Sequence, residues 1–193
     1  MNTFKTEAKS CVLLFTTICV IVVILTLFIT LVAQLAMPDK ANGSLLYVGD
    51  TVVGSELIGQ SFTSPGYFHG RPSAVDYDGL NSSASNLGPT SAVLMEQVKE
   101  RIEQVRRENN LPADATVPAD LVLASGSGLD PHIGVDSAML QVARVAAARG
   151  LEESEVRALV EQHIEGLQLG FLGQERVNVL KLNIALDELA AGS

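Results

Sequence analysis

Apolar residues are distributed unevenly along this chain, and the longest apolar run lies near the N-terminus. The 29 residues at positions 10–38 carry no charged side chain, and most of them are Leu, Ile, Val and Phe. A helix needs roughly 20 apolar residues to cross about 30 Å of hydrocarbon, and it satisfies its own backbone polar groups inside lipid. The pattern therefore predicts one membrane-spanning helix at residues 11–36, after a short tail at residues 1–10.

A cleaved signal peptide is the alternative interpretation of this run. The apolar region of a signal peptide is about 7–15 residues long and ends at an A-x-A-like site. Here the run is much longer, and Gln34 stands where a small residue is expected two positions before Ala36. We therefore expect the helix to be retained as an anchor.

The lysines around the run indicate its orientation. Lys5 and Lys9 precede it and Lys40 follows it, and the next cation is Arg71. Because cations gather on the cytoplasmic side of a span, we expect a cytoplasmic N-terminus and residues 37–193 outside the cytoplasm. Both cysteines of the chain lie within the apolar run, so the remaining domain needs no disulfide.

One face of the predicted span is formed by small or weakly polar residues at alternating spacings of three and four. They are Thr16, Cys19, Val23, Thr26, Thr30 and Ala33. Small residues let neighbouring helices approach closely, and hydroxyl groups can bond across the interface. Our hypothesis is that this face docks on partner helices, with the alternative that each threonine bonds a carbonyl of its own preceding turn.

After the span, short alternating segments and amphipathic segments follow one another. The expected elements are strands at 45–48 and 51–53, a long loop at 67–89, a helix from Thr90 or Ser91 to Asn109, a buried strand at 121–123, a helix capped by Asp136 and ended by Gly150, a helix from Glu152 to Gly166, a strand at 177–179 and a helix at 182–189. Strands and helices mix without strict alternation. The sequence therefore predicts a single N-terminal transmembrane helix and one mixed α/β (α+β) soluble domain.

The charge of this domain excludes some classes of partner. Leaving out Lys5, Lys9 and Glu7 leaves 11 cations and 21 anions, a net charge of −10. Such a balance argues against nucleic acid or an anionic lipid surface as the main partner. The chain has no tryptophan and few aromatic residues, so it offers no obvious stacking platform for sugars or bases.

A serine- and glycine-rich stretch at 125–132 suggests hydrolase chemistry at first sight. Ser127 is flanked at the spacing of a nucleophile elbow by Ser125 and Leu129 rather than by glycines. No Gly-Lys-Ser/Thr follows the glycines, so the stretch is not a P-loop either. His132 lies two residues from Asp130, but a triad is recognised by geometry and not by proximity in sequence. We interpret the stretch as a structural turn.

The run Tyr67, Phe68, His69 and Arg71 is the second candidate site. A metal site at His69 would need partners, and the other two histidines lie far away in the sequence. Arginine can bond several carbonyls or a carboxylate at once, so Arg71 fits a loop anchor. We predict that these four residues belong to an ordered, partner-facing loop, and that the chain is a non-catalytic accessory protein without a bound metal or cofactor.

Several sequence blocks resemble a known family, the C chain (KdpC) of the bacterial potassium-transporting P-type ATPase. The most specific block is YFHGRPSA at 67–74. The others are ANGSL at 41–45, GSELIGQ at 54–60, SNLGP at 85–89, ASGSGLD at 124–130, RVA at 144–146 and NIALD at 183–187. The order and spacing of these blocks agree with the family, and the resemblance covers nearly the whole chain.

The resemblance implies a single-span inner-membrane subunit of a high-affinity ATP-driven potassium uptake complex. Its partners would be a channel-like potassium-binding chain (KdpA), an ATP-hydrolysing P-type chain (KdpB) and a very small single-span chain (KdpF). ATP and potassium would be handled by these partners. The family's C chain is needed for assembly and is described as a catalytic chaperone that raises the ATP affinity of the hydrolysing chain.

A direct nucleotide role conflicts with the predicted topology, because an outer domain cannot reach cytoplasmic ATP. The family's nucleotide-binding likeness rests on a Gly-Gly pair, and the matching stretch here reads SSASNL at 82–87. Ser83, Ser85 and Asn86 are therefore only weak nucleotide-binding candidates, because glycine lets the backbone approach phosphate more closely. The competing classes are an anchored extracytoplasmic serine hydrolase, using Ser125 or Ser127 with His132, and an anchored ligand-binding module.

Overall fold

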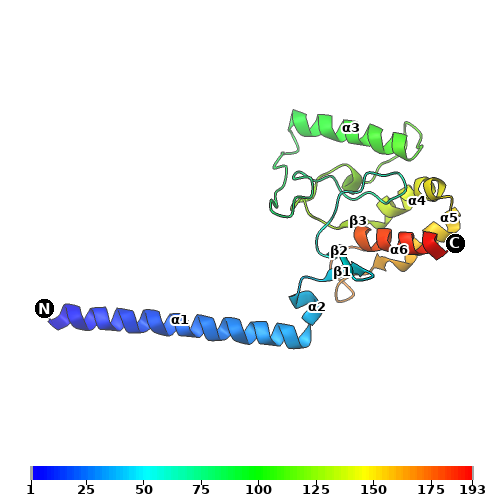
Figure 1. Ribbon diagram of the computed structural model, residues 1–193. Coiled ribbons are helices and arrows are strands. Elements are labelled where there is room, and N and C mark those ends of the chain that lie inside the picture. The colour runs from blue at the N-terminus through cyan, green and yellow to red at the C-terminus, as the bar shows by residue number, and fades with distance from the viewer. Residues whose placement is uncertain (1, 193) are drawn as a thin grey trace. The chain divides into compact units, whose positions relative to one another are not determined.

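The computed structural model describes residues 2–192, and it divides the chain into two compact units, Met1–Leu45 and Leu46–Ser193. The prediction of one N-terminal apolar helix and one mixed domain is confirmed (Figure 1).

The first unit consists of one long helix and one short helix. Helix α1 spans Asn2–Ala36, and its segment Thr6–Ala36 has a mean hydropathy of 3.1 and is long and apolar enough to cross a membrane. Helix α2, Pro38–Ala41, begins at a proline, whose missing N–H is best tolerated in a first helical turn. The proline therefore separates the two helices at Met37.

The second unit contains two small sheets. Strands β1 (Leu45–Val48) and β2 (Thr51–Ser55) form a hairpin at the predicted positions. Strands β3 (His132–Gly134), β5 (Arg176–Asn178) and β4 (Ile164–Glu165) form an antiparallel sheet in that order. Val177 of the central strand pairs with Ile133 on one side and Ile164 on the other. Neither β3 nor β4 was expected from the sequence, because two or three residues are too few to show an alternating pattern.

Among the described residues, four α-helices complete the domain. They are α3 (Ala92–Glu108), α4 (Val135–Arg149), α5 (Glu153–Gln162) and α6 (Val179–Gly192). Ser91 caps α3 as expected, and its hydroxyl accepts the Leu94 N–H at 3.4 Å. Gly150 ends α4 in the left-handed conformation, where a side chain would be strained. The predicted helix after Glu152 ends at Gln162 rather than at Gly166, because residues 164–165 pair with β5.

Two expectations for this region were wrong. Residues 121–123 do not form a strand: Ala119–Leu121 is a 3-10 helix, and Leu121 and Val122 are nevertheless buried. Asp136 does not cap α4, which already includes Val135. The N-cap residue is Gly134, and the Asp120 carboxylate accepts its N–H at 2.6 Å and the Ser137 hydroxyl.

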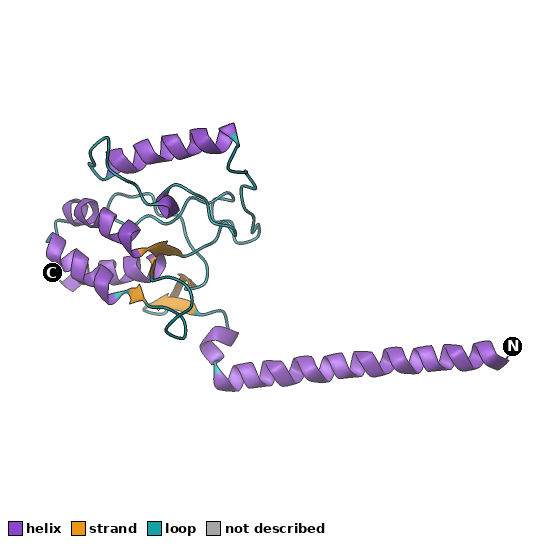
Figure 2. Ribbon diagram, turned by 180° about the vertical axis from the view of Figure 1, so that it is seen from behind, coloured by secondary structure: helices purple, strands orange, loops and turns teal. Residues whose placement is uncertain are grey.

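The hydrophobic core lies between α4, α5, α6 and the three-stranded sheet. It contains Val142 and Val145 of α4, Val156 and Val160 of α5, Leu182 and Leu186 of α6, and Ile133 and Val177 of the sheet. Phe68, from the long loop, is fully buried among them. Helix α3 contributes no buried side chain, and Figures 1 and 2 show it at the opposite end of the domain from the β1–β2 hairpin.

Candidate functional site

The loop at residues 64–73 holds the four residues that were expected to face a partner, and its backbone is bound by side chains of α4 and α6. Asn183 accepts the Phe68 N–H at 2.8 Å and donates to the Phe68 carbonyl at 3.0 Å. Gln141 accepts the His69 N–H at 2.8 Å and donates to the His69 carbonyl at 3.2 Å. Each buried carboxamide therefore satisfies the N–H and the carbonyl of one loop residue, as the backbone of a neighbouring strand would. It can do so because it offers both a donor and an acceptor.

Arg144 joins the same loop to α4 and to the end of α3 through all three nitrogens of its guanidinium group. Its Nη1 donates to the carbonyls of Pro65 at 2.6 Å and Tyr67 at 3.0 Å. Its Nη2 donates to Gln141 at 2.7 Å and its Nε to Asn109 at 3.0 Å. The residue is only 7% exposed, and burial lowers the pKa of the guanidinium while Glu108 opposes that shift. A charge that is hidden from water in this way is stabilised by the hydrogen bonds it makes.

Tyr67 is held by the last residue of α4 and by Asp187 of α6. The guanidinium carbon of Arg149 lies 4.4 Å from the centre of the Tyr67 ring, and its Nε donates to the Gly66 carbonyl at 2.6 Å. Arg149 also pairs with Asp187 at 2.7 Å, and the Tyr67 hydroxyl donates to the same carboxylate at 3.1 Å. The 64–73 loop, α4 and α6 thus meet at one place.

Arg71 joins the loop to the serine- and glycine-rich stretch through an ion pair with Asp130 at 3.1 Å. Burial alone would raise the pKa of Asp130, but hydrogen bonds from His132 and the charge of Arg71 hold it below its ordinary value. The Tyr77 hydroxyl donates to the Arg71 carbonyl at 2.6 Å, and burial, with the Asp130 charge, raises the pKa of Tyr77 to about 12. Arg71 is therefore a loop anchor, as its residue type suggested.

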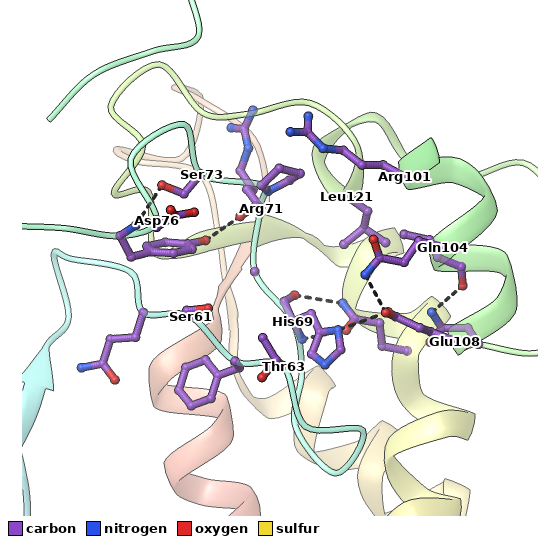
Figure 3. Close-up of a pocket in the computed structure, with 18 residues that line it drawn as sticks. Ser61, Thr63, His69, Arg71, Ser73, Asp76, Arg101, Gln104, Glu108 and Leu121 are labelled. Atoms are coloured by element: carbon purple, nitrogen blue, oxygen red, sulfur yellow. Dashed lines mark hydrogen bonds and ion pairs between the residues drawn. The ribbon is translucent and has the colours of Figure 1, made fainter. Parts of the chain in front are cut away.

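A cleft of about 460 Å³ lies between the 64–73 loop and α3 (Figure 3). The His69 ring contacts Glu108 of α3 at 3.4 Å through Nδ1, and its Nε2 lies 3.1 Å from the Ser64 carbonyl. Burial and the charge of Arg144 lower the pKa of His69. The contact between His69 and Glu108 crosses this cleft, so it joins α3 to the 64–73 loop.

A network of charged and polar side chains lies at the other side of Asp130. His132 lies 3.5 Å from Asp130 and 3.4 Å from Glu165, and Glu165 also pairs with Arg176 at 3.1 Å. Lys181 pairs with Glu165 at 3.5 Å and with Glu56 at 2.5 Å. Although burial opposes it, this pairing, mainly with Glu56, raises the pKa of Lys181. The chain of charges connects the end of β2 to the edge of the three-stranded sheet.

The geometry gives no support to serine hydrolase chemistry. The Ser125 hydroxyl accepts the Gly128 N–H at 2.9 Å, and the Ser127 hydroxyl accepts the Leu129 N–H at 3.1 Å. Within residues 2–192, no hydrogen bond joins either serine to His132, whose ring nitrogens face carboxylates. Both serines therefore stabilise a turn, as the sequence suggested. No group of three or more His, Cys, Asp or Glu side chains among the described residues is arranged to hold a metal ion.

The weak nucleotide candidates lie on an exposed segment. The Ser83 N–H donates to the Ser127 carbonyl at 3.0 Å and its hydroxyl to the Ala84 carbonyl at 3.2 Å. Ser85 and Asn86 are exposed, and none of the three residues lines the cleft described above. Their assignment to nucleotide stays a prediction.

On α1, the hydroxyl groups of Thr16 and Thr26 donate at 2.8 Å to the carbonyls of Val12 and Val22, one turn back. These bonds satisfy both hydroxyl donors within the helix and leave the oxygens able to accept a further bond. Docking of the Thr16–Ala33 face on a partner helix therefore stays a prediction.

Of the four residues expected to face a partner, only Phe68 is placed where it cannot do so. The side chain of Phe68 is fully buried, so it belongs to the core and is not available to a partner. Tyr67, His69 and Arg71 contact the domain but are partly exposed, so their contact with a partner stays a prediction. Sequence reasoning missed Gln141, Arg144 and Asn183. A signal existed for Gln141, which lies three residues after Ala138 and four before Val145, and therefore on the buried face of α4.

Fold and site together define a class of protein: one N-terminal apolar helix that fits a single-pass membrane protein, followed by a mixed domain whose buried polar side chains bind its own backbone. Residues 7–188 match the family described as KdpC, the c chain of K+-transporting ATPase. The chain therefore belongs to the KdpC family.

Three relatives illustrate the similarity, and each carries the name potassium-transporting ATPase KdpC subunit. The protein of Nitratidesulfovibrio vulgaris is 55% identical over 167 residues, which cover 85% of this chain and 84% of that protein. The proteins of Cereibacter sphaeroides and Mycobacterium bovis are 53% and 52% identical, and the alignments cover 86% of this chain and 87% and 89% of theirs.

Proposed function

We propose that this chain is the accessory C subunit of an ATP-driven potassium uptake complex, and that it is not catalytic itself. The observation that carries the proposal is the family match over residues 7–188. Its partners would be the channel-like potassium-binding chain, the ATP-hydrolysing P-type chain and the small single-span chain. The two serines expected of a hydrolase are used in turns, which further favours an accessory role.

Helix α1 anchors the chain in the bacterial inner membrane in this proposal. Residues 1–10 form the cytoplasmic tail, residues 11–36 span the membrane, and residues 37–193 form the outer domain. The apolar segment Thr6–Ala36 supports the anchor, and the lysines at positions 5 and 9 support the orientation. The domain would then stabilise the complex and cover the outer mouth of the channel-like chain, where its acidic surface concentrates cations.

An effect on ATP affinity is transmitted through the assembled complex in this proposal. An outer domain cannot touch cytoplasmic nucleotide, and the stretch at 82–87 has no Gly-Gly pair. Contacts of α1 with partner helices, through the face from Thr16 to Ala33, would provide the connection.

A pull-down of the tagged full chain in mild detergent, from membranes of potassium-starved cells, tests the assembly. We expect a large polytopic chain and an ATP-hydrolysing chain in fixed stoichiometry, and recovery of this chain alone would contradict the proposal. Neutralising surface carboxylates should lower potassium affinity at low ionic strength; an unchanged affinity would refute cation concentration.

Topology is tested separately by cysteine labelling in a chain whose Cys11 and Cys19 are replaced by alanine. Thr90→Cys in the outer domain should react with a membrane-impermeant maleimide in intact spheroplasts. Thr6→Cys should react only after lysis. The reverse pattern would place the domain in the cytoplasm and make direct nucleotide contact possible.

A further inference from the structure

The loop at residues 166–174 is apolar and yet points into solvent. It connects β4 to β5, reads GLQLGFLGQ and contains no charged residue. Leu169 is 83% exposed and Phe171 is 72% exposed. The loop does not contribute these side chains to the core of the domain.

The loop is a built turn that presents these two side chains at its tip. The Gln168 N–H donates to the Leu172 carbonyl at 2.8 Å, and the Leu172 N–H donates to the Gln168 carbonyl at 2.9 Å. Gly170, between the two apolar residues, has φ +81, a conformation that glycine adopts without strain. The backbone bonds therefore hold Leu169 and Phe171 on a short hairpin that is closed at its base.

A second exposed apolar element lies at the same end of the domain. The β1–β2 hairpin exposes Tyr47, Val48 and Val52 by about half of their surface each, at 58%, 51% and 49%. Figures 1 and 2 show β1 and β2 at the end of the domain opposite α3, and the 166–174 loop reaches toward that end. The ion pairs of Lys181 with Glu56 and Glu165 connect the bases of the two elements.

The length of the connection between α1 and β1 indicates what the exposed apolar loop contacts. Helix α1 ends at Ala36 and β1 begins at Leu45, nine residues later. Even a fully extended connection of that length spans at most about 30 Å, so a chain anchored by α1 keeps the domain close to the bilayer surface. Such a tether raises the effective concentration of lipid at the loop, and weak apolar insertion then suffices.

We propose that the 166–174 loop inserts Leu169 and Phe171 into the interfacial layer of the bilayer that α1 crosses, as a second, reversible membrane contact. Leu and Phe are residue types that interfacial segments bury at the boundary between headgroups and acyl chains. The net charge of −10 outside the tail gives no electrostatic attraction to anionic lipid, so the contact is apolar. The inference rests on the proposed anchoring of α1.

The chain contains no tryptophan, so a single introduced tryptophan reports its own surroundings. The full-length variant Phe171→Trp is placed in phosphatidylcholine nanodiscs with and without bromine on the acyl chains. We expect its emission to shift to shorter wavelength and to be quenched by the brominated lipid. Met95→Trp on α3, where Met95 is 52% exposed at the far end of the domain, is the matched control and should not be quenched.

A third variant separates this inference from the proposed anchor. Phe28→Trp lies in α1 and reports whether the helix is in the bilayer. Quenching of Phe28→Trp without quenching of Phe171→Trp would overturn the loop insertion and leave the anchor standing. If Phe28→Trp itself were not quenched, the proposed anchoring would fail. A shift of Phe171→Trp that occurs only with the partner chains and without quenching would overturn lipid as the occupant in favour of protein.

Discussion

Two loops of the mixed α/β domain behave differently from what their residue types suggest. The 64–73 loop carries a tyrosine, a histidine and an arginine, and it is bound to α4 and α6 by side chains of Gln141, Arg144 and Asn183. The 166–174 loop is apolar and is exposed to solvent at its tip. The comparison shows that the polarity of a loop's side chains does not decide whether the loop packs on its own domain. The 64–73 loop packs there because buried side chains of α4 and α6 bind its backbone.

The largest loss of stability is expected from removing the buried side chain of the 64–73 loop. Phe68→Ala removes a fully buried ring and should lower the free energy of unfolding by about 3–5 kcal/mol. Chemical unfolding of the full chain in detergent, followed by near-ultraviolet circular dichroism, measures it. A loss below about 1 kcal/mol would mean that the loop is not part of the core.

The next largest effect is expected from Arg144→Ala, which removes the donor to the carbonyls of Pro65 and Tyr67 and to the Asn109 side-chain oxygen. We expect the free energy of unfolding to fall by about 3 kcal/mol, because unpaired buried polar groups retain their desolvation cost. The matched control is Arg107→Ala, whose exposed side chain pairs with Glu103, and its free energy of unfolding should change by no more than about 0.5 kcal/mol. Equal losses in both variants would contradict the role of Arg144.

A smaller effect is expected from pH. Burial and the Arg144 charge lower the pKa of His69 in the folded chain, although Glu108 opposes them. The unfolded chain therefore binds more protons as the pH falls below the ordinary histidine value of about 6.5, and stability is lost as the pH falls through the folded-state pKa. Unfolding at about pH 7 and about pH 5 should show a smaller loss for His69→Gln than for the unmodified chain. His163→Gln serves as the control, and an equal loss in all three would refute this assignment.

The smallest effect on stability is expected in the 166–174 loop. Replacing Leu169 and Phe171 together by serine should change the free energy of unfolding in detergent by no more than about 0.5 kcal/mol, because both side chains are exposed. Phe62→Ser is the contrasting variant, because Phe62 packs against the core and its loss should be clearly destabilising. A large loss in the double variant would show that the loop is a structural element and would remove the contrast between the two loops.

The sequence by itself determined the elements that rest on long local patterns. An uncharged run of 29 residues can form only a helix in lipid, and α1 has that position. The same holds for the β1–β2 hairpin, for α3 with its Ser91 cap and for the end of α4 at Gly150. Periodicity, caps and turn residues act over a few neighbouring positions, so a single sequence contains them.

Only the tertiary structure decided which distant polar groups meet. Asp120 rather than Asp136 binds the start of α4, and Leu121 and Val122 are buried without forming a strand. Gln141 and Asn183 bind the backbone of a loop more than seventy residues away in the chain. Strands β3 and β4 exist because β5 lies between them. These contacts depend on how the helices pack in three dimensions, and the spacing of residues along the chain carries no record of that packing.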